Sequence, residues 1–206
     1  DRALRRYYPG HRFEIPPLVH FGSWVGGDRD GNPNVTPEIT RSSVRAHLGL
    51  SLRRYIEAIG NLRRDLSESI RLVNVSDELL ASIDEDRRVI TLDQETMRRY
   101  IVEPYRLKLW FVEQRLRHTL AAVPEGKPAD APGYPSAAAF LADLELIRDS
   151  LRANKGAALA DSGLLPDLML QVGTFGFRLA ELDVRQHSEE HERALTDIFA
   201  ALRFGG

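Results

Sequence analysis

The sequence has no cysteine, and none of its apolar runs approaches the ~20 residues that a membrane-spanning helix needs. The first absence excludes disulfides and thiolate chemistry, and it fits a reducing cytoplasm, where we expect the protein to work. The second absence argues against a membrane protein. The first residues, Asp1 to Arg6, have no apolar stretch behind them, so they do not have the pattern of a signal peptide.

The sequence also lacks a strong excess of charge of either sign. Its net charge of −2 gives no electrostatic reason to expect nucleic acid or an acidic membrane as a partner. An apolar content of 43% and a charged content of 28% are ordinary for a globular protein. The 206 residues begin without Met and end in Phe204-Gly205-Gly206, so we interpret them as an internal piece of a longer polypeptide.

Helical patterns occupy most of the chain. Apolar residues recur every three or four positions from Val44 to Val73, which predicts one long amphipathic helix over about residues 37–73. Thr36 and Pro37 suit its N-cap and its first position. The same reasoning predicts helices over 77–83, over 92–122 with a break before Pro104, from Ser136 to about Asn154, over 158–171, and over 189–202 with Ser188 as the cap.

Two short segments have the composition of strands. Residues 18–25 are apolar and bounded by glycine, and residues 177–184 end in the apolar Leu182 and Val184. Two strands cannot form a stable sheet alone. Either this chain pairs with strands supplied from elsewhere, or both segments are buried connectors in an all-helical domain.

The loop over residues 26–34 concentrates backbone freedom and charge. Its glycines let main-chain N–H groups approach an anion, and Arg29 can clamp a phosphate or carboxylate with two parallel hydrogen bonds. Asp28 and Asp30 can orient that arginine or take part in a cation site, and Trp24 supplies a rigid apolar wall. The same residues equally fit a glycine-rich turn whose aspartates only cap local N–H groups.

One alternative for this loop is a phosphatase. Asp28-Arg29-Asp30 resembles the beginning of the signature of haloacid-dehalogenase-type phosphatases, in which Asp28 would be the nucleophile and Asp30 the general acid. That signature expects a hydrophobic strand to run directly into the first aspartate, whereas Gly26-Gly27 intervenes here.

Two metal-site patterns also fail in detail. An EF-hand that starts at Asp28 would need glycine and glutamate where Pro33 and Ile39 stand. His187 and His191 match the His-x-x-Glu-His pattern of inverted zinc peptidases. They lie at a predicted helix start, however, and no further ligand motif follows, so the sequence predicts no metal ligands in this chain.

A longer motif points to one family. The run Phe21-Gly-Ser-Trp-Val-Gly-Gly-Asp-Arg-Asp-Gly-Asn-Pro-Asn-Val-Thr36 closely resembles the Ser-Trp-x-Gly-Gly-Asp-Arg-Asp-Gly-Asn-Pro-x-Val-Thr motif of bacterial and plant phosphoenolpyruvate carboxylases. Residues 103–106, Glu-Pro-Tyr-Arg, agree with a second family segment. Residues 175–191 resemble a third, Phe-Gly followed by Leu-Asp-Ile-Arg-Gln-Glu-Ser and a histidine, with His187 in place of the usual glutamate.

The resemblance implies a mostly α-helical piece that carries about two strands of a (β/α)₈ barrel. Residues 1–206 would then form a single partial domain. It would contain a barrel strand at 18–25, a helical insertion at 37–171, the next strand at 177–184 and a helix at 189–202. The loop 26–34 and Arg185 would lie at the carboxyl ends of their strands, where barrel active sites are built.

The resemblance also implies a reaction. Phosphoenolpyruvate and bicarbonate would give oxaloacetate and phosphate, assisted by Mg²⁺ or Mn²⁺ whose ligands are expected outside this chain. Arg185 would hold the phosphoryl oxygens, Trp24 would wall the pocket for the methylene carbon, and Asp28 and Arg29 would shape and support this substrate site.

The family's catalytic-histidine segment, metal-binding segments and mobile loop have no counterpart here, so no catalytic residue is assigned and the piece alone is expected to be inactive. Its partners would be the remainder of the same chain and, as in the family, the other subunits of a homotetramer. A non-catalytic helical interaction module is the main alternative. For Arg185, a plain salt bridge with Asp183 or Glu181 is the competing interpretation.

Overall fold

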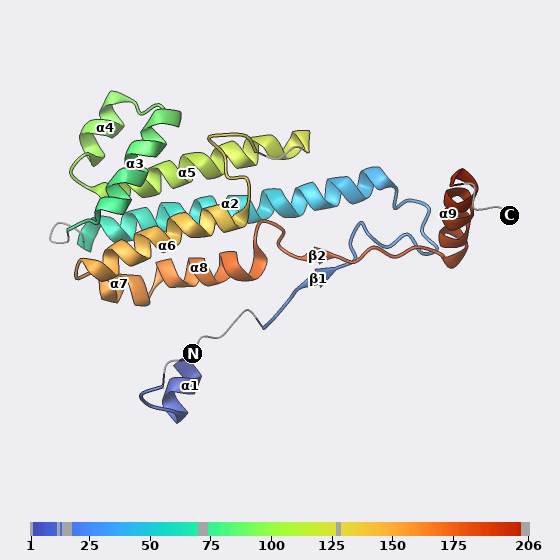
Figure 1. Ribbon diagram of the computed structural model, residues 1–206, viewed down its shortest axis with the longest axis horizontal. Coiled ribbons are helices and arrows are strands. Elements are labelled where there is room, and N and C mark those ends of the chain that lie inside the picture. The colour runs from blue at the N-terminus through green and yellow to red at the C-terminus, as the bar shows by residue number, and fades with distance from the viewer. Residues whose placement is uncertain (1, 12, 14–17, 70–73, 127–128, 203–206) are drawn as a thin grey trace.

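The structure, a computed structural model, describes residues 2–11, 13, 18–69, 74–126 and 129–202. Helices account for most of the described residues, which confirms the mostly α-helical prediction (Figure 1). The elements are α1 (Arg2–Tyr7), β1 (Gly22–Ser23), α2 (Pro37–Ser69), α3 (Asp77–Val89), α4 (Gln94–Tyr100), α5 (Pro104–Ala122), the 3₁₀ helix η2 (Val123–Glu125), α6 (Ala137–Ala153), α7 (Ala157–Asp161), α8 (Leu164–Phe175), β2 (Glu181–Leu182) and α9 (Ser188–Ala201).

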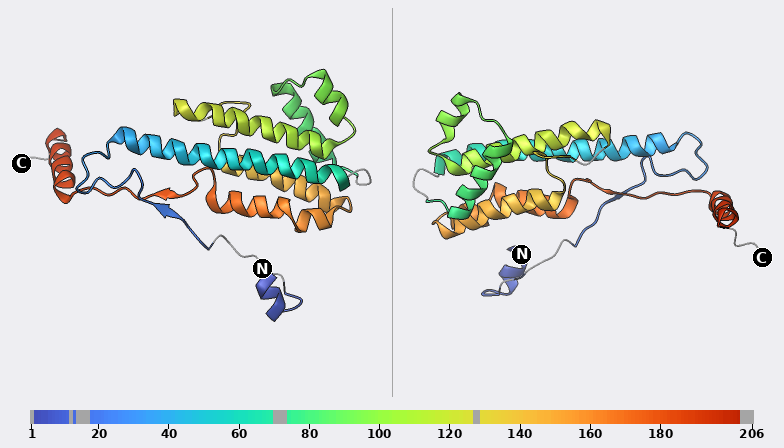
Figure 2. Two further views of the ribbon diagram at one scale, coloured as in Figure 1. Left: turned by 180° about the vertical axis from the view of Figure 1, so that it is seen from behind. Right: turned by 45° about the horizontal axis from the view of Figure 1, so that its top comes forward.

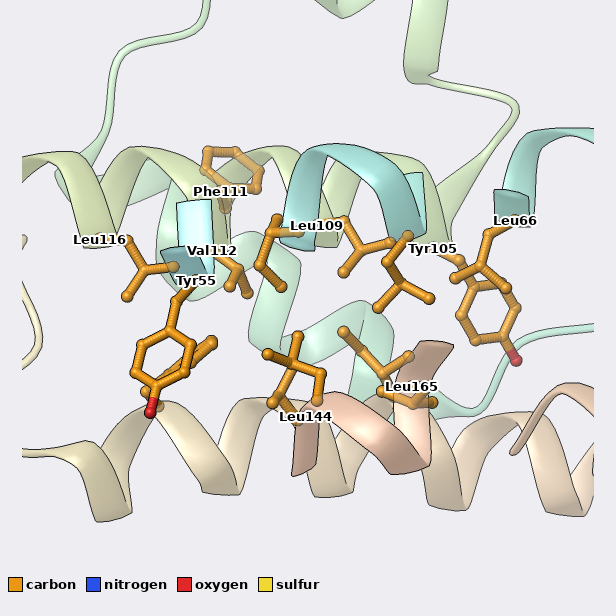
Figure 3. Close-up of a cluster of buried hydrophobic side chains, with 14 of the residues drawn as sticks. Tyr55, Leu66, Tyr105, Leu109, Phe111, Val112, Leu116, Leu144 and Leu165 are labelled. Atoms are coloured by element: carbon orange, nitrogen blue, oxygen red, sulfur yellow. The ribbon is translucent and has the colours of Figure 1, made fainter. Parts of the chain in front are cut away.

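The core lies in a bundle built mainly from α2, α3, α5, α6 and α8. The helices α2 and α5 run side by side along its length (Figures 1 and 3). Helical spacing places one apolar residue of α2 on the same face every three or four positions, and this face is buried against α5. The large apolar residues that α2 buries are Leu52, Tyr55, Ile59, Leu62 and Leu66.

Local signals set several helix ends as predicted. Ser76 caps α3 by accepting a hydrogen bond from the backbone N–H of Leu79, and Ser136 caps α6 in the same way from Ala139. The expected break before Pro104 is present, because α4 ends at Tyr100 and α5 begins at the proline.

Other helix bounds differ from the prediction. The helix expected to end near Ile83 continues to Val89. The helix expected over 158–171 is two helices, α7 and α8, because Gly163 between them has φ of +89°, which a helix cannot continue through. His187, rather than Ser188, caps α9. The expected end of the long helix, residues 70–73, lies outside the described residues.

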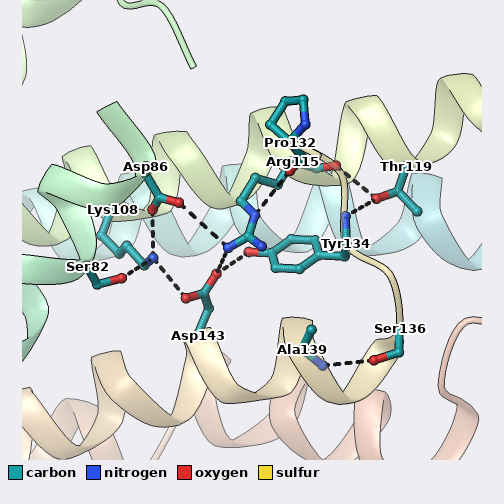
Figure 4. A network of polar contacts seen from close by, with 10 residues as sticks. All are labelled: Ser82, Asp86, Lys108, Arg115, Thr119, Pro132, Tyr134, Ser136, Ala139 and Asp143. Atoms are coloured by element: carbon teal, nitrogen blue, oxygen red, sulfur yellow. Dashed lines mark hydrogen bonds and ion pairs between the residues drawn. The ribbon is translucent and has the colours of Figure 1, made fainter. Parts of the chain in front are cut away.

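A network of buried charges ties the bundle together (Figure 4). Lys108 of α5 is fully buried, and its Nζ lies 2.7 Å from Asp86 of α3 and 2.8 Å from Asp143 of α6. Arg115 also pairs with Asp143, at 2.9 Å, and stacks on the ring of Tyr134. Burial raises the pKa of Asp86, an effect that the nearby ammonium of Lys108 opposes. Each buried charge therefore has an opposite partner, as burial requires.

The two strands are shorter than predicted, but they do pair. β1 and β2 lie parallel, with Gly22 opposite Glu181 and Ser23 opposite Leu182. The predicted spans 18–25 and 177–184 are wrong in length because each strand has only one neighbour within the described chain. In addition, Leu179 has φ of +63°, so residues 177–180 form a turn. A (β/α)₈ barrel is not formed by these residues and stays a prediction.

Three parts of the chain lie away from the core. Figures 1 and 2 show α1 and α9 apart from the bundle, and the first turns of α2 extending beyond its neighbours. No residue of α9 is buried, although it carries Leu195, Ile198 and Phe199, each more than half exposed. Among the described helices, none is both long enough and apolar enough to cross a membrane.

Candidate functional site

The candidate site forms where the two strands lead into the glycine-rich loop. Beyond the paired residues the backbone contacts continue: Arg185 donates from its N–H to the carbonyl of Gly27 at 3.0 Å, and Arg29 donates to the carbonyl of Arg185 at 2.9 Å. These bonds place Asp28 opposite Arg185 in an isolated parallel bridge. The structure therefore brings the loop and Arg185 together at the carboxyl ends of two parallel strands.

Two glycines allow this close approach. A Cβ on Gly27 would lie 2.4 Å from the carbonyl oxygen of Asp183, so only glycine fits between the two segments. Gly26 has φ of +81° and faces α2, where a Cβ would lie 2.0 Å from Oγ of Ser43. The loop is thus held between the 182–185 segment on one side and the start of α2 on the other.

The side chain of Arg185 has two partners from different segments. Its Nε and Nη2 lie 3.0 Å and 2.9 Å from the same carboxylate oxygen of Asp183. Its guanidinium carbon lies 5.1 Å from the centre of the Trp24 ring. The guanidinium is half exposed, so it remains accessible to a ligand. The predicted salt bridge with Asp183 is present, and Glu181 does not pair with Arg185.

The side chain of Asp28 makes a contact within the loop, and the side chain of Arg29 makes a contact with α2. One carboxylate oxygen of Asp28 accepts a hydrogen bond from the N–H of Asp30 at 3.3 Å, a local turn contact. Arg29 donates from Nη2 to Oγ1 of Thr40 on α2 at 3.0 Å, and its buried Nε has no acceptor among the described residues. No ion pair joins Asp28 to Arg29 within these described residues, so each side chain has its own local role.

An open hollow of about 640 Å³ lies beside the loop. Its lining includes Arg29, Asn32 and the start of α2, together with His187 and Glu190 at the start of α9. Its lining carries both signs of charge. The hollow thus lies between the loop and the residues that follow Arg185, namely Gln186 and His187.

The histidine pair has no zinc geometry. His187 lies outside the helix as the cap of α9, where its Nδ1 accepts a hydrogen bond from the N–H of Glu189 at 3.4 Å. His191 lies within α9 and is exposed. Across the described part of the chain, no group of three or more histidine, aspartate or glutamate side chains is arranged to hold a metal ion.

Comparison with known proteins decides the family. The family model for phosphoenolpyruvate carboxylase matches residues 1–205. The chain belongs to the phosphoenolpyruvate carboxylase family. This membership favours the carboxylase interpretation over the phosphatase and the interaction module, and it agrees with the motif at the site described above.

Similar curated proteins named phosphoenolpyruvate carboxylase come from several bacteria. One from Roseiflexus castenholzii is 39% identical over 98% of this chain and 22% of its own length. One from Azorhizobium caulinodans is 42% identical over 90% of this chain and 20% of its own length, and one from a Synechococcus strain is 40% identical over 95% and 21%. The chain thus spans about a fifth of the length of these relatives.

Sequence reasoning missed the support that α2 gives to the loop. Thr40 and Ser43 lie three residues apart, on one face of the helix, and both contact the loop. The signal available was a pair of small polar residues at helical spacing directly after a glycine-rich loop. That pattern is common on exposed helices, so it did not distinguish these two positions.

Proposed function

We propose that this chain is the part of a longer phosphoenolpyruvate carboxylase that binds the phosphoryl group of the substrate, and that Arg185 is the residue that contacts this group. One observation carries the proposal: Trp24, Asp28 and Arg185, which the family motifs had singled out, lie together at the carboxyl ends of the paired strands. Family membership supports the reaction class. A half-exposed guanidinium beside an indole suits a phosphorylated, partly apolar substrate.

The proposed reaction begins when an oxygen of bicarbonate attacks phosphorus. The bond from phosphorus to the enol oxygen breaks, which gives carboxyphosphate and the enolate of pyruvate. Carboxyphosphate then releases CO₂ and phosphate, and the methylene carbon of the enolate attacks CO₂ to form oxaloacetate. Arg185 neutralises charge on the phosphoryl oxygens during transfer. Trp24, which is 59% exposed, provides the apolar wall that shields the enolate carbon from water.

Asp183 and Trp24 leave part of the guanidinium available for this role. Because Asp183 engages only Nε and Nη2, both N–H groups of Nη1 remain free of acceptors among the described residues. Asp183 holds one edge of the guanidinium and Trp24 covers one face. The side chain therefore loses little conformational entropy when it binds an oxyanion. This arrangement suits a side chain that is preorganised to bind phosphate.

The described residues do not fit a metal site, so we assign no step of the reaction to a metal within them. Our proposal keeps Mg²⁺ or Mn²⁺ as the cofactor, held by other residues of the longer chain. It also keeps the remainder of the same chain as the partner that completes the site, within a homotetrameric cytoplasmic enzyme.

The test is Arg185→Ala in the full-length enzyme, assayed for oxaloacetate formation. Loss of one preorganised charge-stabilising donor removes about 2–4 kcal/mol of transition-state stabilisation, so kcat/KM for phosphoenolpyruvate should fall about 30- to 900-fold. The matched control is Arg178→Ala, in the turn before β2. Unchanged kcat/KM in Arg185→Ala would refute the role of this residue in the proposed function.

A further inference from the structure

Arg29 connects Arg185, the residue proposed to bind phosphate, to the helical bundle. Its backbone N–H donates to the carbonyl of Arg185 at 2.9 Å, while its side chain donates from Nη2 to Oγ1 of Thr40 at 3.0 Å. One residue therefore contacts both the backbone of Arg185 and the first turn of α2. Arg29 is thus held by Arg185 at its backbone and by Thr40 at its side chain.

The hydroxyl of Thr40 is oriented to receive Arg29. It donates its proton to the carbonyl of Thr36 at 3.2 Å, which leaves its lone pairs for the guanidinium. The branched side chain of threonine also has few rotamers in a helix. Thr40 is therefore a fixed acceptor rather than a mobile surface hydroxyl.

The helix that carries Thr40 is anchored far from the site. α2 has 33 residues, or about 50 Å of helix, and its second half lies in the core through Leu52, Ile59 and Leu66. Its first turns support the loop at a second point, where Ser43 lies against Gly26. The position of the loop is thus set by a rigid element of the bundle.

We propose that Thr40 is a positioning residue for Arg185, acting through Arg29. The inference rests on the proposed function, because it assumes that Arg185 binds the phosphoryl group. Arg29 on this view holds the backbone of Arg185 in register and does not itself contact substrate. A misplacement of a fraction of an ångström at a charge-stabilising group is enough to slow the reaction.

The experiment uses the full-length enzyme and four single variants. Thr40→Val removes the hydroxyl at constant shape and should lower kcat/KM about three- to tenfold, the range expected for one hydrogen bond. Thr40→Ser keeps the hydroxyl and should restore most of the loss. Ser42→Ala, at an exposed position on the same turn of α2, is the matched control and should behave as wild type. Arg185→Ala provides the reference background.

The decisive measurement is the double variant Thr40→Val with Arg185→Ala. If Thr40 acts through Arg185, removing its hydroxyl should lower kcat/KM no further once Arg185 is absent. Melting temperatures of all variants report any general loss of folding, which would affect both backgrounds alike.

Two results would overturn the inference: an equal loss from Thr40→Val in both backgrounds, or wild-type kcat/KM in Thr40→Val. Either can occur while Arg185→Ala alone is strongly impaired, in which case the proposed function stands. Wild-type kcat/KM in Arg185→Ala would instead refute the proposed function itself, and the inference with it.

Discussion

The guanidinium of Arg185 stacks on the ring of Trp24, with 5.1 Å between its central carbon and the ring centre, although the whole helical bundle separates the two residues in the chain. A stack of this kind at an exposed position contributes only about 0.5–1 kcal/mol. Its main consequence is therefore orientation rather than stability. The contact covers one face of the guanidinium, and the side chain of Arg185 stays half exposed.

Gly27→Ala should disrupt this arrangement. The added Cβ would lie 2.4 Å from the carbonyl oxygen of Asp183 and 3.1 Å from Cγ of Leu182, so backbone must move. That movement breaks the hydrogen bond between the N–H of Arg185 and the carbonyl of Gly27. We expect kcat/KM for phosphoenolpyruvate in the full-length enzyme to fall at least tenfold.

The control for this substitution is Gly22→Ala in β1. A Cβ there has room, since its nearest neighbour is the carbonyl oxygen of Glu181 at 4.0 Å. Equal effects of the two alanines would show that close packing at Gly27 does not position Arg185.

Asp183→Asn tests whether the salt bridge with Asp183 helps or hinders the binding of substrate by Arg185. The pair is half exposed on both sides, so its contribution to stability is small, about 0–1 kcal/mol. If Asp183 orients Arg185, the variant should keep its melting temperature while kcat/KM falls about three- to tenfold. If the carboxylate instead competes with substrate for the guanidinium, kcat/KM should rise.

Glu181→Gln is the matched control, because Glu181 lies two residues before Asp183 and its carboxylate does not pair with Arg185 in the described structure. It should leave kcat/KM unchanged. A similar loss in both variants would indicate a general effect of local charge.

The site was predictable from sequence because its two halves are short and rich in distinctive residues. A glycine-rich loop and an arginine after a strand are both local patterns, and the family motif placed them on neighbouring strands. The backbone bridge between Asp28 and Arg185 brings the two halves side by side, while the binding roles of these residues stay predictions. The spans of the strands were not predictable, because a strand extends only as far as its pairing, and β1 and β2 pair over two residues each within the described chain.

The buried charge network had no sequence signal at all. Lys108 of α5 pairs with residues 22 and 35 positions away, which lie on two other helices, and periodicity within one helix does not reveal such pairs. Polar residues on a predicted helix are normally assigned to the solvent face. Only the packing of α3 and α6 on α5 reveals that Lys108 is enclosed.

Tyr55 should show a displaced titration. Its hydroxyl donates to the carbonyl of Gly176 at 2.6 Å, which joins α2 to the segment that leads to β2. Burial raises the pKa of Tyr55 to about 12. Because the folded pKa lies above the unfolded value of 10, the stability that this group contributes is full below pH 10 and is lost as pH rises toward 12.

The measurement is an ultraviolet difference titration of wild type against Tyr55→Phe. The phenolate signal that the substitution removes should appear near pH 12, not near pH 10. Tyr7→Phe, at a position that is 76% exposed, is the control and should leave that signal in place. A Tyr55 signal near pH 10 would contradict the burial that we describe.

Lys108→Met should be strongly destabilising. The substitution fits the available space but leaves Asp86 and Asp143 without the ammonium that lies within 2.8 Å of both. Removing one partner from a buried ion cluster costs about 3–5 kcal/mol. We expect a lower melting temperature and faster hydrogen exchange in α3, α5 and α6. Lys155→Met, at an exposed position, should change stability by no more than about 0.5 kcal/mol.

The stability lost in Lys108→Met should also depend on pH, and the burial of Asp86 sets the direction of this dependence. Burial raises the pKa of Asp86, and the substitution removes the main group that opposes this rise. A carboxyl group with a raised folded pKa favours the folded state most below its unfolded pKa of 3.8, and that contribution is lost as pH increases. The difference in melting temperature between wild type and Lys108→Met should therefore narrow as pH is lowered toward 4. A difference that widens on acidification would show that the carboxylates do not depend on Lys108.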